Sequence, residues 1–193
     1  MICSQNRSYS KKCDDNQLNA MAVRYINIRR RPAKPQQGLM EVGPAVFPCA
    51  LGRGGISALK REGDGATPLA VLCLLGGYRK YPLEAACSRL PVSEIRKDLG
   101  WCDAPSDPNY NRPVRLPYPA SHERMLRADR LYDLCIVLDW NISERRRNRG
   151  SAIFLHIAKP GFQPTEGCVA VSPETMRRLL PHLSRQTRLR ICR

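Results

Sequence analysis

Cys168 and His156 are the two side chains whose types and spacing suit covalent chemistry. His156 lies twelve residues before Cys168, so one loop separates an imidazole from a thiol. A free thiol has a pKa of about 8.5 and is mostly protonated at neutral pH, whereas an imidazole that accepts its proton makes the thiolate nucleophile. The pair therefore predicts acyl-transfer chemistry. The alternative interpretation is a buried structural cysteine beside a core histidine, because free cysteine is often simply a small buried apolar residue.

The elements around these two residues are predicted from local patterns. The segment 152–157 alternates with a period of two and is expected to be a strand. His156 then shares one face with Ala152 and Phe154, and the opposite face holds Ile153, Leu155 and Ile157. A short strand over 168–171 is expected to follow the loop.

A helix is predicted over 173–183. Ser172 is a favoured N-cap residue, Pro173 suits the first helical position, and Glu174 places an acid in the first turn. Pro181 is expected to kink or end this helix. The apolar face comprises Met176, Leu179, Leu180 and Leu183. The alternating segment 187–191 then predicts a final strand.

This order of elements resembles the L,D-transpeptidase family, also called the YkuD or ErfK type. His156 matches the histidine that ends a strand in the family, and the motif Thr165-Glu166-Gly167-Cys168 matches its Ser/Thr-x-Gly-Cys sequence. The upstream segment Gly63-Asp64-Gly65-Ala66-Thr67-Pro68 resembles the Gly-Asp-Gly-x-Thr-Pro segment of the family. The resemblance extends from about residue 21 to residue 191.

The resemblance implies a cysteine enzyme that acts on peptidoglycan stem peptides without a cofactor or metal. Cys168 would be the nucleophile and His156 the general base, and a thioester would form as the terminal D-alanine leaves. Backbone N–H groups around Gly167 and Cys168 would form the oxyanion hole, with Gly167 allowing close backbone approach. Thr165 and Glu166, which flank the nucleophile in the motif, are expected to contact substrate.

Four departures from the family pattern leave the outcome of the reaction open. Glu166 stands where many members have His or Asn, Ala170 replaces an Arg, and Ile157 replaces a Gly. The loop between His156 and Cys168 is also shorter than in common members. A carboxylate at Glu166 without an Arg at position 170 favours an amine acceptor. The alternatives are an L,D-carboxypeptidase-like hydrolase and a non-catalytic basic binding protein that retains the fold.

A proline-rich segment in the middle of the chain is predicted to form an extended, ordered crossing rather than a helix. His122 follows it and is expected to line the substrate groove, with Glu123 or Arg124 binding a charged group of the peptide. A lone histidine in an irregular segment is more often a surface residue, so this role is the weaker of the two interpretations.

The fold class expected is mainly β with minor α, and the resemblance implies a closed or sandwich-like mixed sheet. Residues 1–20 are polar and predict a disordered extension that is dispensable for stability, with the catalytic domain over 21–193; Met21 is an alternative start. A helix is also expected over 82–100. Strands are predicted at 22–28, 45–50, 68–75, 131–138, 152–157, 168–171 and 187–191.

Composition bounds the partners and the compartment. A net charge of +15 with arginine clusters at 29–31 and 145–149 allows an anionic wall polymer as a partner, whereas the lack of interleaved aromatic residues disfavours nucleic acid. Nine cysteines without a CxxC pair disfavour a disulfide framework and a zinc site. No apolar run is long enough for a membrane span. The resemblance implies the periplasm or cell envelope, but no signal peptide is visible, and a reducing cytoplasm remains the alternative.

Overall fold

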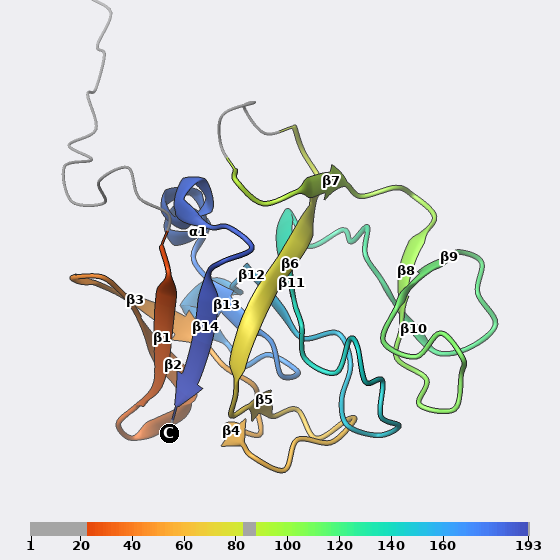
Figure 1. Cartoon of the computed structure of the whole chain (residues 1–193), viewed down its shortest axis with the longest axis horizontal. Coiled ribbons are helices and arrows are strands. Elements are labelled where there is room, and N and C mark those ends of the chain that lie inside the picture. Colours follow the sequence, from red (N-terminus) through yellow and green to blue (C-terminus); the bar gives the residue numbers. More distant parts are fainter. Residues whose placement is uncertain (1–22, 83–87, 193) are drawn as a thin grey trace, which may run out of the picture.

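The computed structural model describes residues 23–82 and 88–192. Strand β11 (Leu134–Leu138) closes a nine-stranded mixed sheet into a barrel, because it pairs with β12 (Phe154–Ile157) on one edge and with β6 (Val71–Arg79) on the other (Figure 1). The ring continues from β12 through β13 (Val169–Val171), β3 (Ala45–Ala50), β2 (Lys34–Val42), β1 (Tyr25–Arg31) and β14 (Arg188–Cys192) back to β6, and β7 (Val92–Glu94) extends β6. Closure pairs both edges of the sheet, as in other barrels.

Alternate residues of each strand fill the interior of the barrel. Ile26 and Ile28 of β1 and Leu189 of β14 are fully buried there, while their neighbours in the sequence point outward. The same period places Leu155 of β12 inside and Phe154 outside the ring. The outward-facing residues of each strand are therefore the ones available for function.

One end of the barrel is covered by helix α1 (Pro173–Leu179). The Ser172 hydroxyl caps it by accepting a hydrogen bond from the Thr175 N–H at 3.0 Å, and Pro173 occupies its first turn. Met176 contributes to the interior apolar cluster. The helix turns into a 3-10 helix, η2 (Leu180–His182), at the proline, so the predicted cap and the predicted end at Pro181 are both confirmed.

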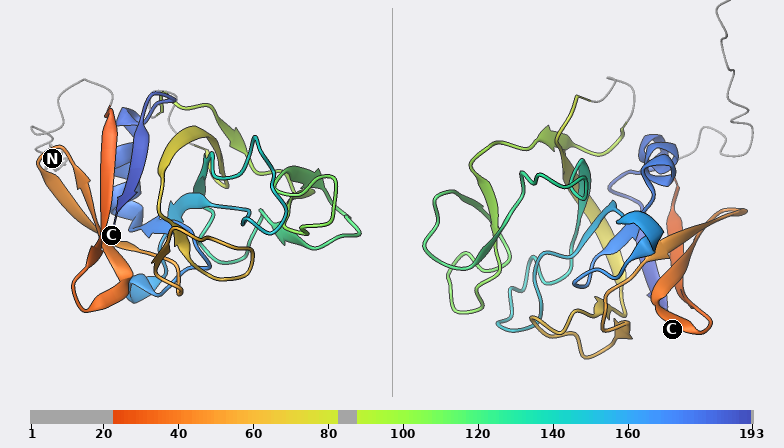
Figure 2. Two further views of the ribbon diagram at one scale, coloured as in Figure 1. Left: turned by 60° about the horizontal axis from the view of Figure 1, so that its bottom comes forward. Right: turned by 180° about the vertical axis from the view of Figure 1, so that it is seen from behind.

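A second layer, formed by the chain between β6 and β11, packs against the outside of the barrel. Its three-stranded sheet has the order β10 (His122–Arg124), β8 (Leu99–Cys102), β9 (Pro113–Arg115). Figure 2 shows this layer projecting from one side of the barrel in both views. The Trp101 ring meets Phe154 of β12 edge-on, with 5.1 Å between centroids, so the outward face of β11 and β12 becomes a second apolar core. We call the part of this layer that follows β7, residues 95–133, the insertion.

The fold class and most strand predictions are confirmed. Of the two forms expected, a closed sheet and a sandwich-like one, the structure has the closed sheet. The helix expected over 82–100 is wrong in the part that the structure describes, because Val92–Glu94 pairs with β6 as strand β7. The sequence did not predict β2 or the insertion strands. The short pair β4 (Ile56–Ser57) and β5 (Thr67–Pro68) precedes β6. Residues 83–87 and the expected extension, 1–20, lie outside the described residues.

None of the helices in residues 23–82 and 88–192 has the length and apolar character that crossing a bilayer needs.

Candidate functional site

A pocket of about 620 Å³ lies between the barrel and the insertion. Its walls come from the loop before Cys168, the end of β12, the Gly-Asp-Gly segment and strand β10, together with residues 127–132, residues 151–152 and Asp103. The side chains predicted from sequence all line it: Cys168, His156, Thr165, Glu166, His122 and Arg124. The structure thus brings together residues that lie up to 46 positions apart in the sequence, in a concave site of the size that binds small ligands.

Cys168 lies at the floor of this pocket with its sulfur in a defined position. The sulfur accepts a hydrogen bond from the Phe154 N–H at 3.3 Å and donates one to the Ala152 carbonyl at 3.2 Å. Only 7% of the residue is exposed. Burial raises the pKa of the Cys168 thiol to about 12, and the charge of Glu123 acts in the same direction. The resting sulfur is therefore a neutral thiol that donates its proton to a carbonyl.

His156 is buried on the same outward face of the sheet. Its Nδ1 lies 2.8 Å from the carbonyl oxygen of Ile157, which can only accept, so Nδ1 bears the proton and Nε2 is free to accept one. Burial lowers the pKa of His156 to about 4, and the nearby guanidinium of Arg127 lowers it further. Because the contact uses the backbone of Ile157, a side chain at this position, where the family has glycine, does not disturb it. The imidazole is consequently neutral at pH 7.

Two thiols flank His156, and only one of them reaches the pocket. Cys135 of β11 lies directly opposite His156, whereas Cys168 precedes Val169, the partner of Leu155, and is a diagonal neighbour. Diagonal neighbours on one face remain within reach of an aromatic side chain. Cys135 does not line the pocket and Cys168 does. Access to substrate therefore favours Cys168 as the nucleophile.

The loop that presents Cys168 is held by the Thr165 hydroxyl. This oxygen accepts from the Gly167 N–H at 3.2 Å and donates to the Cys168 carbonyl at 2.7 Å. The Thr165 backbone pairs with its neighbours too, since the Arg53 N–H donates to its carbonyl at 2.8 Å. The hydroxyl therefore orders the loop. Because the Gly167 N–H is engaged in that loop, the Cys168 N–H becomes the candidate oxyanion donor.

Gly167 is required by a close backbone contact between the two sequence motifs. Its φ is +130°, and a Cβ built there would lie 2.8 Å from the carbonyl oxygen of Ala66. The Ala66 segment is held in turn by Asp64, whose carboxylate accepts from the Ala66 N–H at 2.8 Å and pairs with Lys60 at 2.6 Å. Burial opposes ionisation of Asp64, but these hydrogen bonds prevail and lower its pKa. The Gly-Asp-Gly segment thus forms a platform beneath the Cys168 loop.

Glu166 has a partner that the sequence did not reveal. Its carboxylate accepts from Arg53 Nε at 2.8 Å, and the Arg53 guanidinium also donates to the Gly63 carbonyl at 3.0 Å. Position 170 holds no arginine, as the sequence indicates, but Arg53 in the loop after β3 pairs with the Glu166 carboxylate instead. Ala170 itself is fully buried between His156 and Ala50 in the sheet.

The insertion provides the opposite wall of the pocket. The half-buried carboxylate of Glu123 accepts from the Tyr132 hydroxyl at 2.6 Å and pairs with Arg127 at 3.4 Å. Arg127 also binds Asp129 at 2.7 Å. The Tyr132 ring lies edge-on to His156, with 5.4 Å between centroids. Burial raises the pKa of both Glu123 and Tyr132. This network fixes the aromatic ring against the candidate base.

Several pocket residues were missed from the sequence because their positions depend on distant contacts. They are Glu62, Asp103, Arg127, Tyr132, Ser151, Ala152 and Lys159. Tyr132 fell at the start of a segment predicted as strand, but no local signal indicates that its ring covers His156. Glu62, by contrast, directly precedes the Gly-Asp-Gly segment, so its proximity to a recognised motif was the one available signal.

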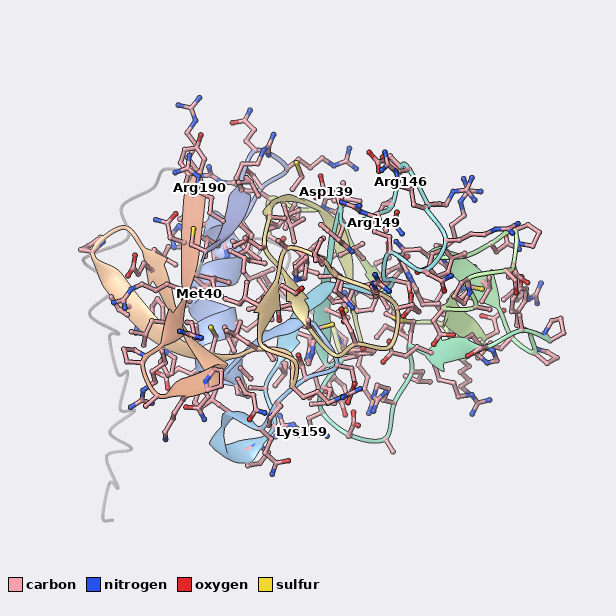
Figure 3. All side chains as sticks on the ribbon, turned by 90° about the horizontal axis from the view of Figure 1, so that it is seen from below. Met40, Asp139, Arg146, Arg149, Lys159 and Arg190 are labelled. Atoms are coloured by element: carbon pink, nitrogen blue, oxygen red, sulfur yellow. The ribbon has the colours of Figure 1, made fainter. Side chains whose placement is uncertain are left out.

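The arginine clusters lie away from this pocket and contact the protein itself. Arg145 donates to the Pro108 carbonyl at 2.9 Å, Arg149 stacks on Trp140 at 5.4 Å, and Arg29 pairs with Glu41 at 2.6 Å. Figure 3 shows Arg146 and Arg190 toward one edge of the molecule, whereas Lys159, a pocket residue, lies toward the other. Binding of an anionic polymer through these loops stays a prediction.

The part of the chain that the structure describes contains no cluster of three or more His, Cys, Asp or Glu side chains suited to a metal ion. Its six cysteines, Cys49, Cys73, Cys102, Cys135, Cys168 and Cys192, are free thiols.

Comparison with known proteins gives one match. A family model of the YkuD type, described as the L,D-transpeptidase catalytic domain, matches residues 34–191. No curated protein and no solved structure matches the chain. The matched range spans the barrel from β2 to β14 and includes the whole pocket.

Proposed function

Because the chain belongs to the YkuD family of L,D-transpeptidase catalytic domains, we propose that it transfers acyl groups of peptidoglycan stem peptides through a thioester on Cys168. The observation that supports this most strongly is that Cys168 and His156 lie on one face of the sheet in one pocket, where the family motif supplies the cysteine. The proposed substrate is a tetrapeptide stem whose third residue is a diamino acid.

The first half of the proposed reaction forms the thioester. The Cys168 sulfur exchanges its hydrogen bond to Ala152 for one to His156 Nε2, which takes the proton as the sulfur attacks the carbonyl carbon of the third residue. The Cys168 N–H donates to the resulting oxyanion, an interaction worth about 10²–10³ in rate. The C–N bond to D-alanine then breaks, and the imidazolium returns the proton to the leaving amine.

The buried resting state has a chemical consequence for this step. With a thiol pKa of about 12 and an imidazole pKa of about 4, a standing thiolate–imidazolium pair is disfavoured in the free protein. Proton transfer is therefore expected to accompany attack on bound substrate, when the new C–S bond removes the charge from sulfur. Such a site would leave Cys168 less reactive toward general alkylating agents than an exposed thiol such as Cys192.

The second half of the reaction resolves the thioester with an amine or with water. We propose an amine of a second stem peptide as the acceptor, in keeping with the family. Hydrolysis to a free tripeptide is the second candidate, because Glu166, the carboxylate expected to attract an ammonium group, is paired with Arg53 at 2.8 Å. Product analysis of a tetrapeptide incubated with and without excess amine separates the two: a cross-linked product supports transfer, and tripeptide alone in both mixtures contradicts it.

We also propose the cell envelope as the site of action, because the proposed substrate is a wall peptide. Fractionation of cells that express the complete protein measures this directly. Recovery with the cytosol alone would contradict the proposal.

A further inference from the structure

Asp103 extends strand β8 by one residue at the rim of the pocket. Its N–H donates to the Ser121 carbonyl at 3.2 Å, which continues the pairing of Cys102 with His122. The two-residue period then puts Asp103 on the same face of the insertion sheet as Trp101 and, across the pair, Glu123. Trp101 packs against Phe154, the neighbour of Cys168, so this face is turned toward the reacting sulfur.

Four carboxylates line the pocket, and three of them have partners. Glu166 binds Arg53 at 2.8 Å, and Glu123 binds Tyr132 at 2.6 Å. Glu62 accepts hydrogen bonds from the Ser151 hydroxyl at 2.9 Å and from the Tyr110 hydroxyl. Asp103 differs from them: its Oδ1 is buried and has no hydrogen-bond partner among the described residues.

A carboxylate in this situation destabilises the empty pocket and favours a cation. A buried acceptor without a donor has lost its hydrogen bonds to water without replacement, and the cost is larger when the group is charged. The neighbouring Glu123 adds negative potential, since the charge of Asp103 contributes to the raised pKa of Glu123. An ammonium group supplies three hydrogen-bond donors and one positive charge, so it can both pair with the unpartnered oxygen of Asp103 and offset the negative charge there.

We propose that Asp103 is a subsite for an ammonium group of the peptide substrate, placed across the pocket from the Cys168 loop. The proposal rests on the proposed function for the identity of that peptide. A diamino acid offers this chemistry in two places: the free amine of the donor while it is attached to Cys168, and the attacking amine of the acceptor. An acceptor amine must lose its proton before attack, so in that case Asp103 would gather the ammonium form near the thioester.

Half-reaction kinetics distinguish the two sources. Asp103→Asn removes the charge with little change of shape, and Asp98→Asn is the matched control, because Asp98 lies in the same insertion, pairs with Arg115 at 2.8 Å and is not a pocket residue. A donor subsite predicts about tenfold slower thioester formation in Asp103→Asn with an amine-bearing donor, and no change with a norleucine analogue. An acceptor subsite predicts an unchanged acylation rate and about a tenfold lower ratio of aminolysis to hydrolysis.

A second measurement needs no turnover at all. Methanethiosulfonates react with a thiolate by forming a disulfide to its sulfur while methanesulfinate leaves. Cationic aminoethyl and neutral methyl methanethiosulfonate therefore report the potential at Cys168, which is followed by mass analysis of the Cys168 peptide. The cation-to-neutral rate ratio should fall about tenfold in Asp103→Asn and stay unchanged in Asp98→Asn and in the charge-preserving Asp103→Glu.

The outcomes separate this inference from the proposed function. A reduced cation-to-neutral ratio together with absence of any thioester would support the ammonium subsite and reject acyl transfer. An unchanged ratio in a folded Asp103→Asn protein, confirmed by its melting temperature, overturns the subsite. The subsite is equally overturned if Asp103→Asn turns over with an unchanged acylation rate and an unchanged ratio of aminolysis to hydrolysis.

Discussion

Two outward faces of the same barrel differ sharply in their surroundings. On β1 and β14 the outward residues meet solvent: Tyr25 is 42% exposed, and Arg190 lies over its ring at 3.7 Å. On β12 and directly before β13 the outward residues are Phe154, His156 and Cys168, none of which is more than 7% exposed. Both faces follow the two-residue period of a strand, so the strands alone do not explain the difference.

The insertion creates this difference because it covers the outward face of β12 and leaves the outward face of β1 and β14, the bare face, in contact with solvent. Its Trp101 and Tyr132 rings pack on Phe154 with centroid distances of 5.1 and 5.9 Å. The resulting burial, rather than a charged partner, is the largest cause of the pKa changes at Cys168 and His156. The barrel thus positions the candidate nucleophile and base, while the insertion sets their protonation.

The largest expected effect is on activity, where a substitution on the covered face should differ from one on the bare face. His156→Ala should lower the rate of thioester formation by about 10²–10⁴, the range for a positioned general base. Arg190→Ala, which changes an outward residue of the bare face, should leave it unchanged. Single-turnover acylation with a tetrapeptide is the measurement. Equal rates in the parent and His156→Ala proteins would remove His156 from the mechanism.

The next effect concerns stability. Trp101→Ala should lower the free energy of unfolding by about 3–5 kcal/mol, because it deletes the ring that joins the insertion to β12. Tyr25→Ala on the bare face should cost less than about 1 kcal/mol, since a half-exposed ring loses little burial. Denaturant unfolding followed by circular dichroism measures both. Similar losses for the two variants would show that the insertion does not contribute a second core.

The buried histidine predicts a dependence of stability on pH. In the unfolded chain His156 takes up a proton as the pH falls through about 6.5, whereas in the folded protein its pKa is about 4. The unfolded state therefore binds more protons between these values, and the free energy of unfolding should fall by about 3 kcal/mol as the pH is lowered across this window. His156→Gln should flatten the difference between pH 7 and pH 4; a slope identical to that of the parent would contradict the burial of a neutral imidazole.

The smallest effect tests the anchor of the ring that covers His156. Tyr132→Phe keeps the ring and removes the hydroxyl that donates to Glu123, so the free energy of unfolding should fall by about 1–3 kcal/mol. The pH profile of acylation should shift as well, because Glu123 loses a donor that favours its charged form. Glu123→Gln in the same background should restore part of the stability. A profile that does not move would limit Tyr132 to a structural role.

The residues on the face that the insertion covers were predicted from the sequence better than the insertion itself. Period-two alternation identified Phe154 and His156 on one face, and the cap at Ser172 fixed the helix that follows Cys168. These signals are local. The insertion depends on pairs such as His122 with Cys102, and the Glu166–Arg53 ion pair joins residues 113 positions apart, so no short pattern contains them. Strand β2 was missed because Pro35 and Gly38 interrupt its pattern.

The thioester that we propose forms between Cys168 and a stem peptide can be tested directly. Cys135 is the internal control, because its thiol lies directly across from His156 but outside the pocket. Intact-protein mass analysis after incubation with a tetrapeptide should show a tripeptidyl adduct on the parent and on Cys135→Ala, and none on Cys168→Ala, with all three folded by circular dichroism. An adduct that persists in Cys168→Ala, or one that disappears in Cys135→Ala, would show that Cys168 is not the nucleophile or not the only one required.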